Sequence, residues 1–144
     1  PEDLDPDLDV IRTTASAQYG RTTSTGTWAS TLVWGYNAGR GVADDHHSGH
    51  SVVLESDLTQ GPLALFGRAE YVQKHGEELG VVAHELFGIS SLTLGAAHRI
   101  ARLSGVDAML GATGTAYAVP EGLQEAYGEQ PFSAQVFLRL VLDH

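Results

Sequence analysis

Seven charged side chains occur inside otherwise apolar stretches of the sequence, at positions that alternate with apolar ones. They are Arg12, Glu55, Asp57, Arg68, Glu70, Arg99 and Arg139. Ionised groups of both signs on one surface either pair with one another or create a field that selects passing ions by charge and size. The chemistry that this pattern indicates is electrostatic. It predicts a charged lining for an aqueous pore, or a network of ion pairs that plugs it.

A second polar group lies between residues 44 and 50, in the segment Asp44-Asp45-His46-His47-Ser48-Gly49-His50. Imidazole and carboxylate groups at this close spacing suit zinc, copper or nickel. We expect His46, His47 and His50 to form a weak divalent metal site on a long loop. The sequence has no second cluster that completes a tetrahedral set, so a solvated loop without metal is the competing interpretation. Apart from this site, we expect no cofactor.

Motifs for catalysis are missing from the sequence. The chain has no cysteine, which excludes disulfides, thiolate metal sites and thiol nucleophiles. It has no G-x-S-x-G segment, and the pair His84-Glu85 is not continued as H-E-x-x-H. Gly111 and Gly114 lie inside a predicted strand, where a phosphate-binding loop does not form. The sequence therefore predicts a protein that is not an enzyme.

Length and charge limit the classes of protein that remain. The chain has 144 residues, with 18 acidic and 8 basic side chains and a net charge of −10, and we expect one domain over 1–144. Such an acidic balance excludes a nucleic-acid partner, which requires a basic surface. The sequence contains no run of 18 apolar residues, so it predicts no transmembrane helix. Residues 1–9 are rich in aspartate and proline, which indicates an extended, solvated lead-in.

The charged residues lie in stretches where apolar and polar side chains alternate with a period of two, which indicates β-strands. These stretches are about 10–22, 27–37, 51–59, 63–74, 88–102, 106–119 and 132–142. Short turns alternate with long loops at about 37–50, 75–87 and 120–131. Strands of about ten residues, with short turns at one end and long loops at the other, are typical of membrane barrels. We therefore predict an all-β fold, an antiparallel up-and-down transmembrane β-barrel.

Most charged residues of the predicted strands share one parity, and most apolar residues share the other. Two exceptions, Arg21 and Arg102, lie beside short turns, where a long side chain can reach lipid headgroups. Aromatic residues lie near both ends of the predicted strands, as they do in the aromatic girdles of membrane barrels. They are Tyr19, Trp28, Trp34, Tyr36, Tyr71 and Phe132. A soluble ligand-binding barrel with its apolar side chains inside shows the same alternation, so it remains an alternative.

The predicted strands are odd in number, whereas bacterial single-chain barrels have an even number and keep both termini in the periplasm. The last strand descends from a long loop, which directs the C-terminus to the periplasm and segment 1–9 to the cell exterior. We therefore expect at least one strand before Pro1, so that the chain is the C-terminal part of a larger barrel. A strand missed inside a long loop, for example around Val81-Val82, is the competing interpretation.

Five segments carry a resemblance to a known group of proteins. They are Arg12-Thr13-Thr14-Ala15-Ser16-Ala17, Trp28-Ala29-Ser30-Thr31-Leu32-Val33-Trp34-Gly35, Leu54-Glu55-Ser56, Phe66-Gly67-Arg68-Ala69-Glu70 and Val136-Phe137-Leu138-Arg139-Leu140. In this order they resemble the C-terminal part of poorly characterised outer-membrane β-barrel proteins of Gram-negative bacteria, over nearly the whole chain. The resemblance implies location, architecture and the passage of small or metal-linked solutes. Many such barrels end in phenylalanine, whereas this chain ends Leu142-Asp143-His144.

The expected function is porin-like passage of small solutes or ions through a charged lumen in the outer membrane of a Gram-negative bacterium. The expected partners are the lipid bilayer, lipopolysaccharide, the solutes, and either the remainder of a larger barrel or further copies of the chain. A structural or adhesion barrel that transports nothing, and makes its contacts through its loops, is the alternative within the same fold.

Overall fold

The computed structural model describes residues 9–40, 48–80 and 85–142. Its strands form one antiparallel sheet in which each strand pairs with its neighbours in sequence. The strands are β1 (Asp9–Thr22), β2 (Gly26–Arg40), β3 (Ser48–Gln60), β4 (Leu63–His75), β5 (Leu86–Leu103), β6 (Val106–Ala118) and β7 (Phe132–Leu142). The prediction of an all-β, antiparallel up-and-down fold is confirmed. The sheet is open, because β1 and β7 are its two edges.

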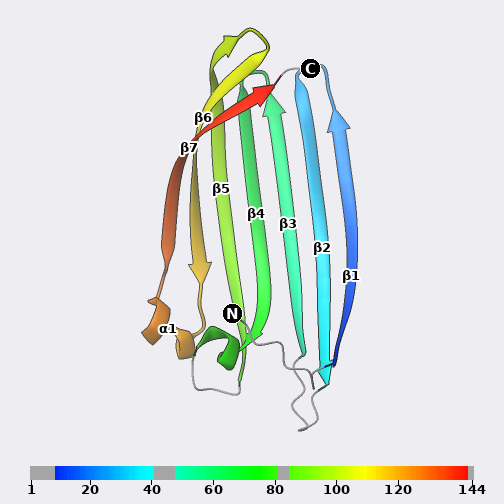
Figure 1. Cartoon of the computed structure of the whole chain (residues 1–144), viewed down its shortest axis with the longest axis vertical. Helices are drawn as coiled ribbons and strands as arrows, with labels where there is room; N and C mark the ends of the chain where they lie inside the picture. Colours follow the sequence, from blue (N-terminus) through cyan, green and yellow to red (C-terminus); the bar gives the residue numbers. More distant parts are fainter. Residues whose placement is uncertain (1–8, 41–47, 81–84, 143–144) are drawn as a thin grey trace.

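Short turns and long connections lie at opposite ends of the sheet. The turns β1–β2, β3–β4 and β5–β6 lie at the top of Figure 1, and the two helical segments lie at the bottom. The arrows of β1 and β7 point the same way, because neighbouring strands alternate in direction and β7 is the seventh strand of the sheet. The two edges therefore cannot pair with one another in an antiparallel manner.

Two of the three long connections, those between β2 and β3 and between β4 and β5, are shorter than the sequence predicts. β2 continues to Arg40 and β3 begins at Ser48, so His50 belongs to a strand rather than to a loop. A 3-10 helix, η1 (Gly76–Leu79), follows β4, and an α-helix, α1 (Glu121–Tyr127), lies between β6 and β7. Residues 81–84, where a further strand was the competing interpretation, lie outside the described residues. Neither described helix has the length and apolar composition needed to cross a membrane.

The sheet has two chemically different faces. Directly paired residues of an antiparallel ladder point to the same side, so the register assigns each residue to a face. One row across all seven strands, the polar row, contains Gln18, Thr31, Glu55, Arg68, Thr93, Thr115 and Ser133. The next row along every strand, the apolar row, contains Ala17, Leu32, Leu54, Ala69, Leu92, Ala116 and Phe132. We call the corresponding surfaces the polar face and the apolar face.

Neither face has a hydrophobic core of its own. The buried hydrophobic residues of the described chain are Phe87, Ala97 and Leu123. Large side chains of the apolar face remain exposed, with Leu54 at 46%, Leu94 at 60% and Leu138 at 63% of their surface. These leucines are not packed together as they are inside a soluble barrel. A sheet with so much apolar surface requires something to cover it, since exposing this area to water is unfavourable.

A β-bulge changes the face of one charged residue. The register of β5 and β6 shifts between Arg99 and Ala101, so that Arg102 pairs with Asp107. Arg102 therefore joins Arg99 on the polar face, although strict alternation assigns it to the apolar face. A bulge has this effect because it inserts one residue into one strand of a pair and reverses the parity beyond it.

Candidate functional site

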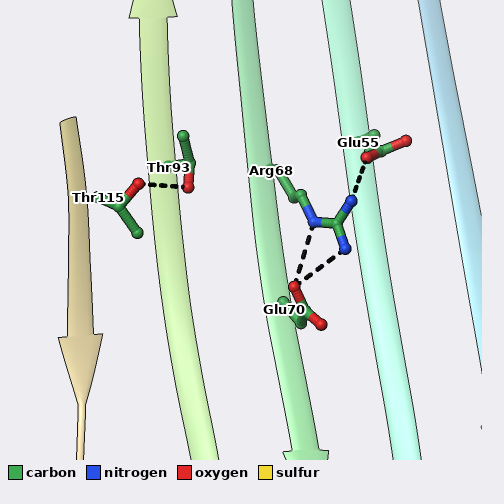
Figure 2. Close-up of polar contacts among 5 residues, drawn as sticks. All are labelled: Glu55, Arg68, Glu70, Thr93 and Thr115. Atoms are coloured by element: carbon green, nitrogen blue, oxygen red, sulfur yellow. Dashed lines mark hydrogen bonds and ion pairs between the residues drawn. The ribbon is translucent and has the colours of Figure 1, made fainter. Parts of the chain in front are cut away.

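The centre of the polar face holds a three-residue ion cluster. Glu55 on β3 and Arg68 on β4 are direct cross-strand partners, and Glu70 follows two residues later on the same face. The Arg68 guanidinium donates through Nη1 to Glu55 Oε1 at 2.7 Å, and through Nη2 and Nε to Glu70 Oε2 at 3.0 and 3.2 Å (Figure 2). The planar guanidinium thus bridges two carboxylates on adjacent strands.

This central cluster remains open to solvent. The side chains of Arg68, Glu55 and Glu70 are 46%, 47% and 34% exposed. Ion pairs of such exposure contribute about 0–1 kcal/mol each to stability, because water screens them and the long side chains lose entropy. Their chemical capacity is to present fixed charges to water and to solutes near the surface.

Hydroxyl groups continue the polar row beyond the ion cluster. Thr93 on β5 and Thr115 on β6 lie opposite one another, with their Oγ1 atoms 2.8 Å apart (Figure 2). Asp57 lies two residues from Glu55 on the same strand and faces the same side. With Arg68, the three carboxylates give this region a net charge of −2. The row is therefore hydrophilic on every strand and negatively charged at its centre.

A second set of charged residues lies at the short-turn end of the polar face. It consists of Arg99, Arg102, Asp107 and Arg139, and we call it the short-turn cluster. Asp107 Oδ1 accepts from Arg102 Nε at 2.6 Å, and Oδ2 accepts from Arg102 Nη2 at 2.8 Å and from Arg99 Nη1 at 2.9 Å. The hydrogen bonds from Arg102, and then those from Arg99, hold the pKa of the Asp107 carboxyl well below its usual range.

Asp107 is absent from the residues that the sequence singled out, although a signal was available. It follows the Ser104-Gly105 turn and shares its parity with Thr113 and Thr115 on β6. Arg139 on β7 and Arg99 on β5 both pair with Met109, so the two arginines lie on one row with Met109 between them.

An aromatic band separates the two charged groups. The Phe66 ring lies over Gly95 and the Phe137 ring over Gly111, each across a direct pair, and the two ring centroids are 6.2 Å apart. From Thr93 to Arg99 the chain advances six residues, or about 20 Å along the strand. The polar face thus has a central acidic region, an aromatic band on glycines, and a basic end.

The structure separates the seven charged residues of the sequence-based site into three places on one face. Glu55, Arg68, Glu70 and Asp57 form the centre, and Arg99 and Arg139 lie at the short-turn end. Arg12 lies near the long-connection end of β1, where its Nε donates to Asn37 Oδ1 at 2.9 Å.

The expected metal ligands have different positions. His46 and His47 lie outside the described residues. His50 lies on the apolar face of β3, where its ring stacks on Tyr36 at 4.6 Å and lies 6.0 Å from Trp34. Within the described ranges, no three histidine or acidic side chains gather in a way that suits a metal ion.

Comparisons of the chain with protein-family models, with curated proteins and with solved structures give no match.

Proposed function

We propose that this chain forms part of the wall of an outer-membrane β-barrel, with its apolar face against lipid and its polar face lining a lumen for small solutes or ions. The observation that carries the proposal is the pair of adjacent rows. One residue step along every strand converts a row that is polar throughout into a row that is apolar throughout. Lipid-facing and lumen-facing residues of a membrane barrel alternate in this way.

The exposed apolar face supports lipid as the covering medium. Burying one large aliphatic or aromatic side chain contributes about 1.5–3 kcal/mol, and many such side chains on this face are exposed. Two helical segments, η1 and α1, lie at the end of the sheet rather than across this face (Figure 1). Acyl chains offer no hydrogen bonds to the sheet, and none are needed within it because the strand ladder already pairs the backbone N–H and C=O groups.

The spacing of aromatic side chains supports a membrane of ordinary thickness. Tyr19 and Trp28 meet edge to face at 5.2 Å near the short turns, and Trp34 and Tyr36 stack at the other end of β2. Eight residues separate Trp28 from Tyr36, or about 27 Å along the strand. A strand tilt of about 40° reduces this to about 20 Å, close to the apolar band of outer-membrane barrels.

Closure of the barrel requires strands beyond the described sheet. A strand that pairs antiparallel with both edges must run against β1 and β7, so the closing segment contributes an odd number of strands. A second copy in the same membrane orientation presents its own β1 and β7 in the parallel direction. We therefore propose a further segment of the protein as the closing wall, with lipopolysaccharide and the bilayer as the outer partners.

A barrel that transports nothing is the second candidate. It is favoured by the Arg68 cluster, in which one guanidinium already satisfies two carboxylates, and by the Phe66–Phe137 pair, which occupies space above the sheet. In a barrel of eight strands such side chains fill the interior, whereas a wider barrel leaves an aqueous channel.

Planar-bilayer conductance distinguishes these two functions. We expect the purified protein to give stepwise currents whose reversal potential shifts toward cation selectivity in Arg68→Gln and toward anion selectivity in Glu70→Gln. Arg21→Gln is the matched control, since Arg21 pairs with Trp28 on the apolar face and its loss leaves the lumen charge unchanged. Absence of current steps supports the plugged barrel. Failure of the protein to enter liposomes refutes both membrane functions.

A further inference from the structure

The polar face has a charge opposite in sign to that of the whole chain. Its cationic side chains are Arg12, Arg68, Lys74, Arg99, Arg102 and Arg139, and its anionic side chains are Glu55, Asp57, Glu70 and Asp107. Six cations and four anions leave +2, whereas the whole chain has −10. The central region contributes −2, so the positive charge belongs to the two ends. A solute on this face therefore meets a local field that the net charge of the chain does not indicate.

The short-turn cluster concentrates this positive charge. It contains three guanidinium groups and one carboxylate, which gives a net charge of +2. Asp107 is only 15% exposed and accepts from both Arg99 and Arg102, so it fixes the direction of these two side chains. The depressed Asp107 pKa keeps the carboxylate ionised, and the arrangement is therefore constant over the neutral pH range.

A hollow adjoins the cluster. It has a volume of about 640 Å³, and its lining includes Arg99, Asp107, Met109, Arg139 and Pro62 of the β3–β4 turn. The amide N–H of Arg99 donates to the Pro62 carbonyl oxygen at 2.8 Å, so the turn is tied to β5 at the edge of the hollow. Two arginines on one row, with an uncharged methionine between them, thus face a space large enough for a small solute.

Hydrogen-bond donors in this hollow remain available. Arg99 gives one Nη1 contact to Asp107, while a guanidinium has five N–H donors. Within the part of the chain that the structure describes, the Arg139 side chain makes no hydrogen bond or ion pair. Guanidinium groups with unused N–H donors bind oxyanions well, since their N–H fork matches the oxygen spacing of phosphate and carboxylate.

We propose that the short-turn cluster binds a small oxyanion, namely a phosphate or carboxylate group, through Arg139 and Arg99. This site deepens the proposed function, on which it rests, by naming oxyanions as a solute class of the lumen. Arg139 and Arg99 donate to the anion from the two sides of Met109. Asp107 is a positioning residue, which holds the Arg99 guanidinium beside the hollow.

Calorimetric titration of the protein with inorganic phosphate tests this site in a phosphate-free, non-ionic detergent. We expect saturable binding that Arg139→Gln weakens by about tenfold to a hundredfold, which is the usual loss for a hydrogen bond to a charged group. Arg139→Lys keeps the charge without the fork, and we expect an intermediate affinity. Arg21→Gln removes the same charge from the apolar face and is expected to change the affinity less than twofold. Unchanged strand circular dichroism establishes that each variant is folded.

Several results overturn the oxyanion site. They are the absence of phosphate binding, equal affinity of Arg139→Gln and the unsubstituted protein, and binding only to vesicles of acidic phospholipid but not to free phosphate. The last result identifies a lipid headgroup as the ligand. Calorimetry in detergent does not require a pore, so a protein that conducts without binding phosphate contradicts only this site. A protein that binds phosphate but gives no current contradicts only the proposed passage of solutes.

Discussion

The contact between Phe137 and Gly111 makes a quantitative test of the packing on the polar face. Phe137 and Gly111 are direct partners across β6 and β7. A Cβ atom added at Gly111 overlaps the Phe137 ring and lies 2.9 Å from the backbone carbonyl oxygen of Ala96. The ring can rotate away, but the Ala96 carbonyl belongs to the β5–β6 ladder and moves only with the strand. Gly111→Ala is therefore an overpacking substitution.

The expected magnitude follows from two opposing contributions. Overpacking in a well-packed site typically costs about 1–3 kcal/mol. Replacing a strand glycine by alanine contributes about 0.5–1 kcal/mol of stability in the absence of a clash, since the unfolded chain loses freedom. Gly20→Ala isolates the second contribution, because a Cβ at Gly20 meets nothing within 4 Å on the same face. The alanine gain is common to both variants and cancels in their comparison, so we expect Gly111→Ala to be less stable than Gly20→Ala by about 1–3 kcal/mol.

Urea unfolding of the protein in detergent micelles, followed by tryptophan fluorescence, measures this difference as a free energy of unfolding. A double variant with Phe137→Ala removes the ring, and we expect it to reduce the effect of Gly111→Ala to what the Ala96 carbonyl alone imposes. Equal stability of Gly111→Ala and Gly20→Ala refutes the reasoning, since it means that neither the Phe137 ring nor the Ala96 carbonyl oxygen crowds a Cβ atom at position 111. An effect of Gly111→Ala that persists in full without the ring assigns it to the backbone contact instead.

Three further outcomes are expected. Leu94→Lys on the apolar face should lower stability in lipid vesicles by about 2–4 kcal/mol. Gln135→Lys, at an exposed position that pairs with Thr113 on the polar face, should change it by no more than about 0.5 kcal/mol; equal effects contradict the lipid-facing orientation. Because its folded-state pKa is depressed, Asp107 should stay ionised as the pH falls through about 3.9, the ordinary value for an aspartate. Its contribution to stability should therefore be lost only at still lower pH. Carboxyl NMR measures this titration, and the Asp107 pKa should rise in Arg102→Gln. Trp28→Phe removes a 2.8 Å hydrogen bond from Nε1 to a serine hydroxyl and should lower the free energy of unfolding by about 0.5–1.5 kcal/mol; no change means that water replaces the bond.

The strands and their two faces were predictable from alternation alone. The stretch predicted at 132–142 coincides with β7, and the other strands differ from prediction by up to three residues at each end. The largest differences lie beside the long loops, for example at Arg40 and Ser48. There the sequence is rich in glycine and polar residues, so its composition indicates a loop. In the structure, pairing with β1 extends β2 to Arg40, and pairing with β2 extends β3 back to Ser48.

Helical segments within the long connections were not predicted. α1 has only seven residues, too few for a helical period to stand out from the surrounding sequence. Its Leu123 is fully buried, and Gly122 lies beside the Phe87 ring. The Tyr127 hydroxyl also donates to the Leu79 carbonyl oxygen at 3.0 Å, although the two residues are far apart in the sequence. Tertiary contacts of this kind stabilise a helix that its own sequence does not specify.

The amino-acid sequence by itself determined that each strand has one polar and one apolar side, because successive side chains of a strand point in opposite directions whatever the strand pairs with. Only the tertiary structure decided which charges meet. The register brings Glu55 opposite Arg68, and the bulge beyond Arg99 turns Arg102 toward Asp107. Periodicity is local, whereas register and bulges depend on hydrogen bonds and side-chain packing between strands, so the same alternation is compatible with several pairings.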